Sequence, residues 1–261
     1  MSEVTIVCCY NKEKVYNDFV STLKTQTCEY DLIGIDNRGN KKFTSCAAAY
    51  NSAIDDVKTK YVIYSHQDIL LDDTEALAKF VDYLKKTNND DIVGVAGVRT
   101  DIDTTLTKIR RIDPATKKLI PEGKPTTDED MTECETLDEC FFGGHTEHFR
   151  NYPFDEGVCN GWHLYAVEAC LRTRFMHNTV NGERGRVYVC YVDLIHNSID
   201  GVNFAFYCQC FKLCRKYAHC CPRVKTTCTD ARTDMLHRYV RIVHAAILAL
   251  KDSIVHKIAG R

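Results

Sequence analysis

The sequence predicts an α/β protein in which helices cover both faces of a mostly parallel central sheet. Within about the first 97 of its 261 residues, a short apolar run occurs four times, and the stretches between these runs carry apolar residues at helical spacing. This alternation is typical of parallel sheets, because each strand must return to the same edge through a helix that packs on the sheet. Polar residues follow several of the runs, at the edge where such sheets bind ligands.

The first part of the chain supplies four strands and three helices. The predicted strands are residues 4–9, 31–35, 61–65 and 92–96. Each helix is predicted from a residue that can cap it, followed by apolar residues three and four positions apart. The candidate caps are Asn11, Ser45, and Asp72 or Asp73, and the second helix extends to about residue 57. The apolar faces are Val15, Phe19 and Leu23 in the first helix and Leu77, Phe80, Val81 and Leu84 in the third.

The alternation stops after Gly97, and the elements that follow are more varied. Residues 106–120 predict a hairpin around the Asp113-Pro114 turn. The polar segment 121–133 is expected to be a mobile loop, and 141–156 is expected to be irregular. Further elements are a helix over 161–176, a strand over 186–195 and a segment rich in cysteine and aromatic residues over 203–228.

A helical stripe of apolar residues begins near Asp234. Its members are Leu236, Tyr239, Val240, Val243, Ile247, Leu250, Ile254 and Ile258. The flanking cations are Arg238, Arg241, Lys251 and Lys257, so the stripe is suited to a membrane surface, and packing on the core or on a second subunit is an equal alternative. The expected organisation is a domain over 1–202, with a Cys-rich segment and an amphipathic helix over 203–261 packed on it.

Composition and charge exclude several classes of protein. The net charge of −2 gives no global field that would recruit nucleic acid. The N-terminus has no signal-peptide pattern, and no run of 18 apolar residues predicts a membrane span. The 15 cysteines include no C-x-x-C pair, so we expect free thiols in a cytoplasmic protein rather than a disulfide scaffold. Zinc binding by the segment 203–228 is the weaker alternative, since its spacing matches no usual ligand frame.

Three predicted strands end in polar residues, and these would face a common crevice. The residues are Tyr10 and Asn11 after the first strand, Asp36 and Asn37 after the second, and His66 and Asp68 after the third. Asp68 beside a second ligand-capable group suits a divalent cation such as Mg²⁺ or Mn²⁺, and a turn-capping carboxylate is the alternative. Asp36 is suited either to a ribose or base contact or to turn chemistry. His196 ends a later strand, where a structural histidine is the commoner role.

The order of several motifs resembles one enzyme family. The segments are VTIVCCYN, LIGIDN, AAAYNSAI, KYVIYSHQDILL, FDE, GWHLYAVEACLRT and IHNSIDG. Together they resemble the family 2 inverting glycosyltransferases of the GT-A fold. The similarity is greatest to a small bacterial branch whose strand-end motif is His-Gln-Asp in place of Asp-x-Asp. The sequence contains no G-x-G-x-x-G, P-loop or H-E-x-x-H motif.

The resemblance implies roles for these residues. Asp36 would contact the nucleotide, with Tyr10, Asn11, Asn37 and Asn51 in the same pocket. Asp68 would bind the metal, with His66 in the position of the first aspartate and His196 completing the site. The family's Glu-Asp pair falls at Tyr165 and Ala166, so the general base must be sought elsewhere. The candidates are His163, Glu168 and Asp138.

The implied function is transfer of a sugar from a nucleotide diphosphate donor, with UDP-sugars expected, to a hydroxyl of a glycan or lipid-linked acceptor. Such a reaction belongs to polysaccharide biosynthesis, and contact with the inner face of the membrane would suit it. The alternative is a nucleotide-binding or scaffold protein that keeps the fold without catalysis, because the usual acid pair is missing. A nucleotidyltransferase is a weaker alternative, since the first strand is not followed by glycine.

Overall fold

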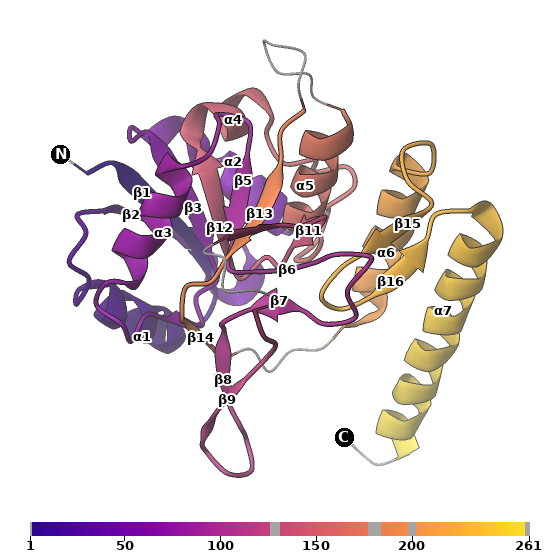
Figure 1. The fold of residues 1–261 in the computed structure, drawn as a ribbon. Coiled ribbons are helices and arrows are strands. Elements are labelled where there is room, and N and C mark those ends of the chain that lie inside the picture. Colours follow the sequence, from indigo (N-terminus) through magenta and orange to yellow (C-terminus); the bar gives the residue numbers. More distant parts are fainter. Residues whose placement is uncertain (1, 126–130, 177–183, 198–201, 259–261) are drawn as a thin grey trace.

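The computed structural model describes residues 2–125, 131–176, 184–197 and 202–258. Its centre is a seven-stranded sheet in the order β10-β13-β5-β12-β3-β1-β2 (Figure 1). These strands are β1 (Val4–Tyr10), β2 (Asp31–Asp36), β3 (Tyr61–Ser65), β5 (Ile92–Gly94), β10 (Met131–Glu133), β12 (Phe141–His145) and β13 (Val187–Cys190). β1, β2 and β3 are parallel neighbours, β13 is parallel to β5, and β12 and β10 run antiparallel to their neighbours. The predicted α/β class with a mostly parallel sheet is confirmed.

Helices cover both faces of this sheet. On one face, α1 (Glu13–Leu23) and α3 (Ala76–Lys85) pack with their buried faces on the strands. On the other face lie α2 (Cys46–Asn51), α4 (Thr146–Asn151) and α5 (Tyr165–Phe175). Apolar side chains that alternate along β1 and β3 enter the two cores in turn, as the period of two in a strand requires.

The predicted caps were only partly correct. Ser45 caps α2, and its hydroxyl oxygen accepts a hydrogen bond from the Ala48 amide at 3.2 Å. This helix ends at Asn51, before a short 3₁₀ helix, η2 (Ile54–Asp56). Asn11 does not cap α1, because Lys12 occupies the N-cap position. Glu75 is the N-cap residue of α3, so neither predicted aspartate holds that place.

The segment 141–156, which we expected to be irregular, contains β12 and α4. Two glycines in β12 hide the alternating pattern of a strand from the sequence. A Cβ atom at Gly143 would collide with the Val62 carbonyl, because β12 lies tightly between β3 and β5. The expected loop 121–133 likewise ends in β10, and its centre, residues 126–130, lies outside the described residues.

Two predicted strands are each split between sheets. Residues 92–96 divide into β5 and β6 (Ala96–Val98), and residues 186–195 divide into β13 and β14 (Ile195–His196). A three-stranded sheet joins β6 to β7 (Leu106–Thr107) and β11 (Thr136–Leu137). A four-stranded sheet has the order β4-β14-β8-β9, and its β4 is Ile69–Leu70. The predicted hairpin is confirmed as β8 (Arg110–Ile112) paired with β9 (Leu119–Pro121).

The C-terminal part of the chain packs on α5 and adds a third core cluster. It consists of α6 (Phe204–Lys216), a hairpin of β15 (Arg223–Lys225) and β16 (Asp230–Arg232), and α7 (Met235–Ile258). α7 runs along one side of the molecule, beyond α6 (Figure 1). Among the described residues, no helix is both long enough and apolar enough to cross a bilayer.

Candidate active site

A cleft of about 790 Å³ opens at the carboxyl ends of β1, β2 and β3. Its walls include Tyr10 and Asn37 from the strand ends, His163 from the approach to α5, and Thr227 from the C-terminal hairpin. Parallel strands that end at one edge make this position the usual ligand site of open α/β sheets. The predicted common crevice is therefore present.

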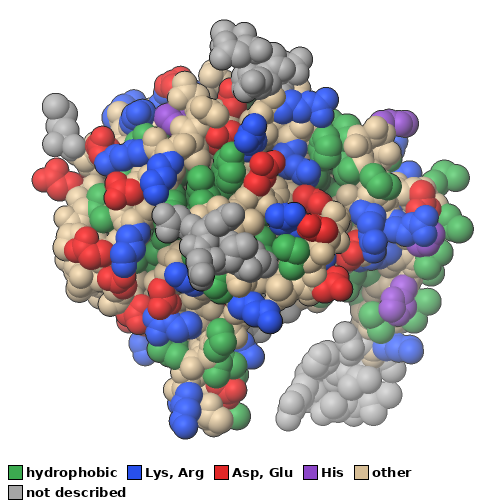
Figure 2. Space-filling model, in the orientation of Figure 1, with side chains coloured by type: hydrophobic (Ala, Val, Ile, Leu, Met, Phe, Trp, Pro, Cys, Tyr) green, Lys and Arg blue, Asp and Glu red, His purple; other side chains and the backbone are tan. Residues whose placement is uncertain are grey.

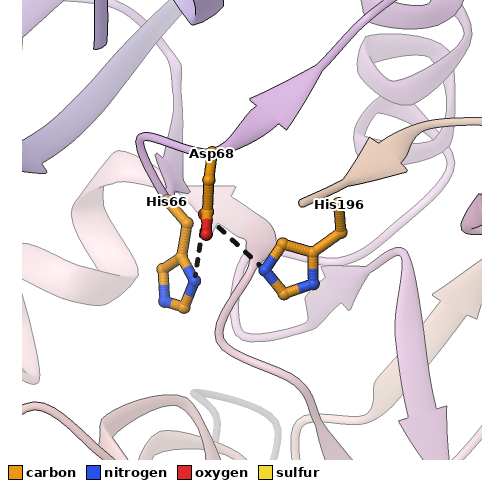
Figure 3. Close-up of side chains that lie close together, drawn as sticks. All are labelled: His66, Asp68 and His196. Atoms are coloured by element: carbon orange, nitrogen blue, oxygen red, sulfur yellow. Dashed lines mark ion pairs between the residues drawn. The ribbon is translucent and has the colours of Figure 1, made fainter. Parts of the chain in front are cut away.

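Three predicted metal ligands meet in this cleft. Asp68 Oδ1 lies 3.9 Å from His66 Nδ1 and 3.6 Å from His196 Nε2, and Figure 3 shows both rings beside the carboxylate. All three ligand atoms lie within 4.8 Å of one another. β14 brings His196 there by pairing antiparallel with β4, which starts one residue after Asp68.

The electrostatics of this group suit a cation. Burial alone would raise the pKa of Asp68, but the charges of the nearby His196 and His66 rings lower it. Burial lowers the pKa of His66 and favours the neutral imidazole, the form that binds metals. Among the described residues, His196 Nε2 is buried and has no hydrogen-bond partner. A buried ring nitrogen that faces a carboxylate can serve as a metal ligand, so the three residues fit a divalent metal.

An acid pair, Asp138 and Glu139, lies at the same edge of the sheet. β12 runs antiparallel to β3 with Phe141 opposite Ser65, so the residues before β12 lie beside those after β3. The His66 amide donates to the Cys140 carbonyl at 2.8 Å, which fixes the two segments together. Asp138 was a candidate base from the sequence, but Glu139 was missed because no strand was predicted after it.

The two acids differ in protonation. Burial opposes ionisation of Asp138, yet His196, His66 and a hydrogen bond from the Thr227 hydroxyl at 2.6 Å lower its pKa. Burial and the adjacent Asp138 raise the pKa of Glu139 well above its usual range. These shifts favour the ionised form of Asp138 and the protonated form of Glu139.

His163, the second candidate base, also lines the cleft. Its ring lies edge-on to Phe206 of α6, with 5.6 Å between the ring centroids. Trp162 and Val202 are further members of this wall. His163 thus lies on an aromatic and apolar side of the cleft.

Glu168, the third candidate base, is not among the residues that line the cleft. Its side chain is fully buried between α5 and α6. The carboxylate accepts hydrogen bonds from Lys216 Nζ at 2.6 Å and from the Tyr217 hydroxyl at 2.9 Å. It lies in the first turn of α5 on the side that faces α6, so it cannot reach a substrate in the cleft.

We expect Glu168→Gln to lower the free energy of unfolding by about 3 kcal/mol, because it leaves part of a buried ion pair uncompensated. Chemical denaturation followed by circular dichroism would measure this change. Glu147→Gln is the matched control, since Glu147 is an exposed acid on α4 and its loss should cost less than about 0.5 kcal/mol. Equal stability of both variants would contradict a structural role for Glu168.

The end of β1 forms another wall of the cleft. Tyr10 lines the cleft and stacks on Tyr16 with 4.0 Å between ring centroids. Gln67, which the sequence analysis did not select, accepts from the Asn11 amide at 3.2 Å and donates to the Asn11 side chain at 2.8 Å. This bridge joins the end of β1 to the His66–Asp68 segment.

Three predicted nucleotide residues are engaged in local structure. Asp36 is not among the residues that line the cleft, and Arg38 binds its carboxylate at 2.6 Å. The side chain of Asn51 hydrogen-bonds to both the backbone carbonyl and the backbone amide of Phe154. Asn51 is likewise not among the residues that line the cleft. Asn37 lines the cleft, but its amide is bonded to the backbone of Phe43. In this structure the Asp36 carboxylate therefore has the alternative role, that of a turn residue bonded to Arg38.

The cysteines take no part in the candidate metal group. All fifteen are free, and within the described ranges none belongs to a cluster that could hold an ion. Cys210 and Cys214 are buried in the core formed with α5.

Comparison with known proteins identifies a family and a fold for this chain. Residues 5–182 match the model of a family described as "Glycosyltransferase like family". No curated protein matches the chain.

Several solved structures have the same fold at low sequence identity. GalNAc-T7 with UDP, GalNAc and Mn²⁺ has a TM-score of 0.54 at 12% identity, over 76% of this chain and 44% of that one. S. aureus TarS 1-349 with UDP-GlcNAc has a TM-score of 0.54 at 13% identity, over 82% and 66%. The mannosyltransferase PcManGT from Pyrobaculum calidifontis, with GDP-Man and Mn²⁺, has a TM-score of 0.54 at 12% identity, over 83% and 63%.

The alignments thus cover between 44% and 66% of these three structures, so the likeness concerns a shared domain. That domain has the GT-A fold. Because the family model covers well over half of the sequence, the chain belongs to this glycosyltransferase-like family.

Proposed function

We propose that the protein transfers a sugar from a nucleotide diphosphate donor to a hydroxyl group, with inversion at the anomeric carbon. The family and the fold support a glycosyltransferase. The observation that carries the proposal is the cleft itself, where a candidate metal group, His66, Asp68 and His196, lies near an ionised acid, Asp138.

The donor is proposed to be a UDP-sugar. GalNAc-T7 was solved with UDP and TarS with UDP-GlcNAc, whereas PcManGT holds GDP-Man. Tyr10 offers a ring face for the nucleobase, and Asn11 offers polar groups beside it. To accept a hydrogen bond from a ribose, the Asp36 carboxylate would have to give up its contact with Arg38.

The metal is proposed to be Mn²⁺ rather than Mg²⁺. Ligand atoms around one cation lie about 3–4 Å apart, since each bond is about 2.0–2.2 Å long. The separations of 3.6 and 3.9 Å around Asp68 are compatible with that spacing. Two imidazoles and one carboxylate are a softer set than the oxygen shell that Mg²⁺ prefers. A bound cation would neutralise charge on the diphosphate of the leaving nucleotide.

Asp138 is proposed as the general base. The acceptor oxygen forms a bond to the anomeric carbon, the bond from that carbon to the diphosphate oxygen breaks, and Asp138 takes the hydroxyl proton. Thr227 and the Cys140 amide, at 2.6 and 3.0 Å, orient this carboxylate while leaving it acceptor capacity. The buried, protonated Glu139 is unsuited to the role.

The acceptor is proposed to be a glycan or a lipid-linked sugar. The wall formed by Trp162, His163 and Phe206 provides aromatic surface for the apolar face of a sugar ring. A cytoplasmic location is part of this proposal, and free cysteines throughout the described chain support a reducing compartment.

A thermal-shift panel of UDP, GDP and their sugars, each with Mn²⁺, Mg²⁺ or chelator, tests the proposal. UDP with Mn²⁺ should raise the stability most, by about 2.7 kcal/mol when the ligand is at 100 times its Kd. Release of UDP from a UDP-sugar should accompany binding. Binding without any release over long incubation would favour the alternative, a non-catalytic nucleotide-binding protein. A panel without any shift would contradict both.

A further inference from the structure

In the described part of α7, four members of the apolar stripe face solvent. Leu236, Val240, Val243 and Ile247 keep between 48% and 69% of their surface exposed. Figure 2 shows hydrophobic and histidine side chains along the outer edge of this helix. In a helix that merely covered a core, the same stripe would be turned inward.

The inward face of α7 is instead held by its cations and small residues. Arg241 donates to the Thr229 hydroxyl and to the Asp230 carbonyl in the hairpin, and Arg238 lies over the Phe211 ring of α6 at 5.8 Å. Ala245, one helical turn beyond Arg241, is buried. Both arginines therefore contact other parts of the same chain.

The exposed stripe has the spacing of a coiled-coil seam. From Leu236 the intervals to Val240, Val243 and Ile247 are four, three and four residues, and in the sequence Leu250 and Ile254 continue them with three and four. In heptad terms, Val240, Ile247 and Ile254 take the a positions, and Leu236, Val243 and Leu250 take the d positions. All three a positions are β-branched and two of the three d positions are leucine, with valine at the third, a pattern close to the one that favours two parallel strands.

The flanking positions favour one orientation of two such helices. The e positions are His237, His244 and Lys251, and the g positions are Tyr239, Ala246 and Ser253. In a parallel pair each g residue faces an e residue of the other helix, so no two cations meet. In an antiparallel pair e faces e, which would bring histidines and lysine together.

A membrane surface fits this helix less well. Interfacial helices present Lys and Arg beside Trp, Phe and Leu. In α7 the two arginines are turned toward the body, and the helix contains neither Trp nor Phe.

We propose that α7 is a dimerisation helix, whose exposed residues Leu236, Val240, Val243 and Ile247 form the seam of a parallel two-stranded coiled coil with the same helix of a second copy of this chain. The proposal is independent of the reaction, since the stripe lies outside the cleft lining.

Sedimentation equilibrium of the full chain tests it, with wild type expected to be a dimer at micromolar concentration. Val243→Glu should raise the dimer Kd by about 100-fold or more, because it places an unpaired charge in the seam. Leu248→Glu is the matched control, since Leu248 is exposed on the same helix but outside the a and d positions. Its Kd should stay within about threefold of wild type.

Ala246→Glu tests the orientation. In the parallel pair, the new glutamate of each chain would face Lys251 of the other chain. These two ion pairs should lower the dimer Kd by about threefold. Unchanged or weaker association would overturn the parallel arrangement. A wild-type monomer, whether or not it co-sediments with phosphatidylglycerol vesicles, would overturn the dimer, as would a Val243→Glu dimer of wild-type affinity. The melting temperature of each variant checks that the fold is kept.

Discussion

Asp68→Ala is expected to abolish the metal dependence of nucleotide binding and to lower turnover by about 10³-fold or more. Asp68 Oδ1 lies near both histidines of the candidate metal group, so its loss removes the central ligand of that group. Charge compensation by a metal at a leaving diphosphate is worth several kcal/mol, which corresponds to this rate loss. Calorimetric titration of UDP with and without Mn²⁺ would measure the first effect, and release of UDP from a UDP-sugar the second.

Asp72→Ala is the matched control for that experiment. Asp72 lies four residues further along, is bound by Arg110 at 2.9 Å and does not line the cleft. Its replacement should leave Mn²⁺-dependent binding intact. If UDP bound the Asp68 variant as well as wild type, with the same gain from Mn²⁺, the metal would have to lie elsewhere.

Asp138→Asn should lower turnover by between about 10²- and 10⁴-fold, the range typical for loss of a general base. The amide keeps the shape of the side chain but cannot take a proton, so donor binding should change little. Steady-state kinetics with an acceptor, compared with calorimetric donor affinity, would separate the two effects. Glu135→Gln is the control, because that acid lies three residues earlier and binds Thr100 away from the cleft.

His163→Ala decides between the remaining candidates. Loss of the imidazole should weaken acceptor binding through the aromatic wall while leaving most of the turnover at saturating acceptor. Should His163→Ala remove turnover and Asp138→Asn leave it unchanged, the imidazole would be the base and Asp138 a group that orients the histidines.

The sequence predicted those parts of the fold whose patterns are local. The first three strands follow from apolar runs that end in polar residues, and the structure confirms them. The candidate ligands after β3, His66 and Asp68, lie together at the edge of the sheet. β12 was missed because its packing between two strands requires glycines, which carry no strand signal. With β12 missing, the acid pair before it could not be assigned to the edge of the sheet.

Glu168 shows a different limit of sequence analysis. Its position near the start of a helix that follows the cleft made it a plausible base, and helical spacing alone does not say which side a helix turns toward its neighbours. α5 is buried almost all round, since it lies between the sheet and α6. Lys216 and Tyr217, which hold the carboxylate, are 48 and 49 residues further on, and no local pattern links them to it.

The site can form only after the segments that build it have been synthesised, and these include the start of β12 and the hairpin that carries Thr227. During synthesis Asp68 leaves the ribosome long before His196, and Asp138 long before Thr227, at separations of 128 and 89 residues. Contacts so distant along the chain are slow to form and cannot begin until the later segment has been made. A nascent chain that stops before the hairpin could build the inner strands of the sheet, yet Asp138, the proposed base, would lack the hydroxyl that orients it. Competence to react is thus acquired late in folding, after the scaffold that carries most of the cleft.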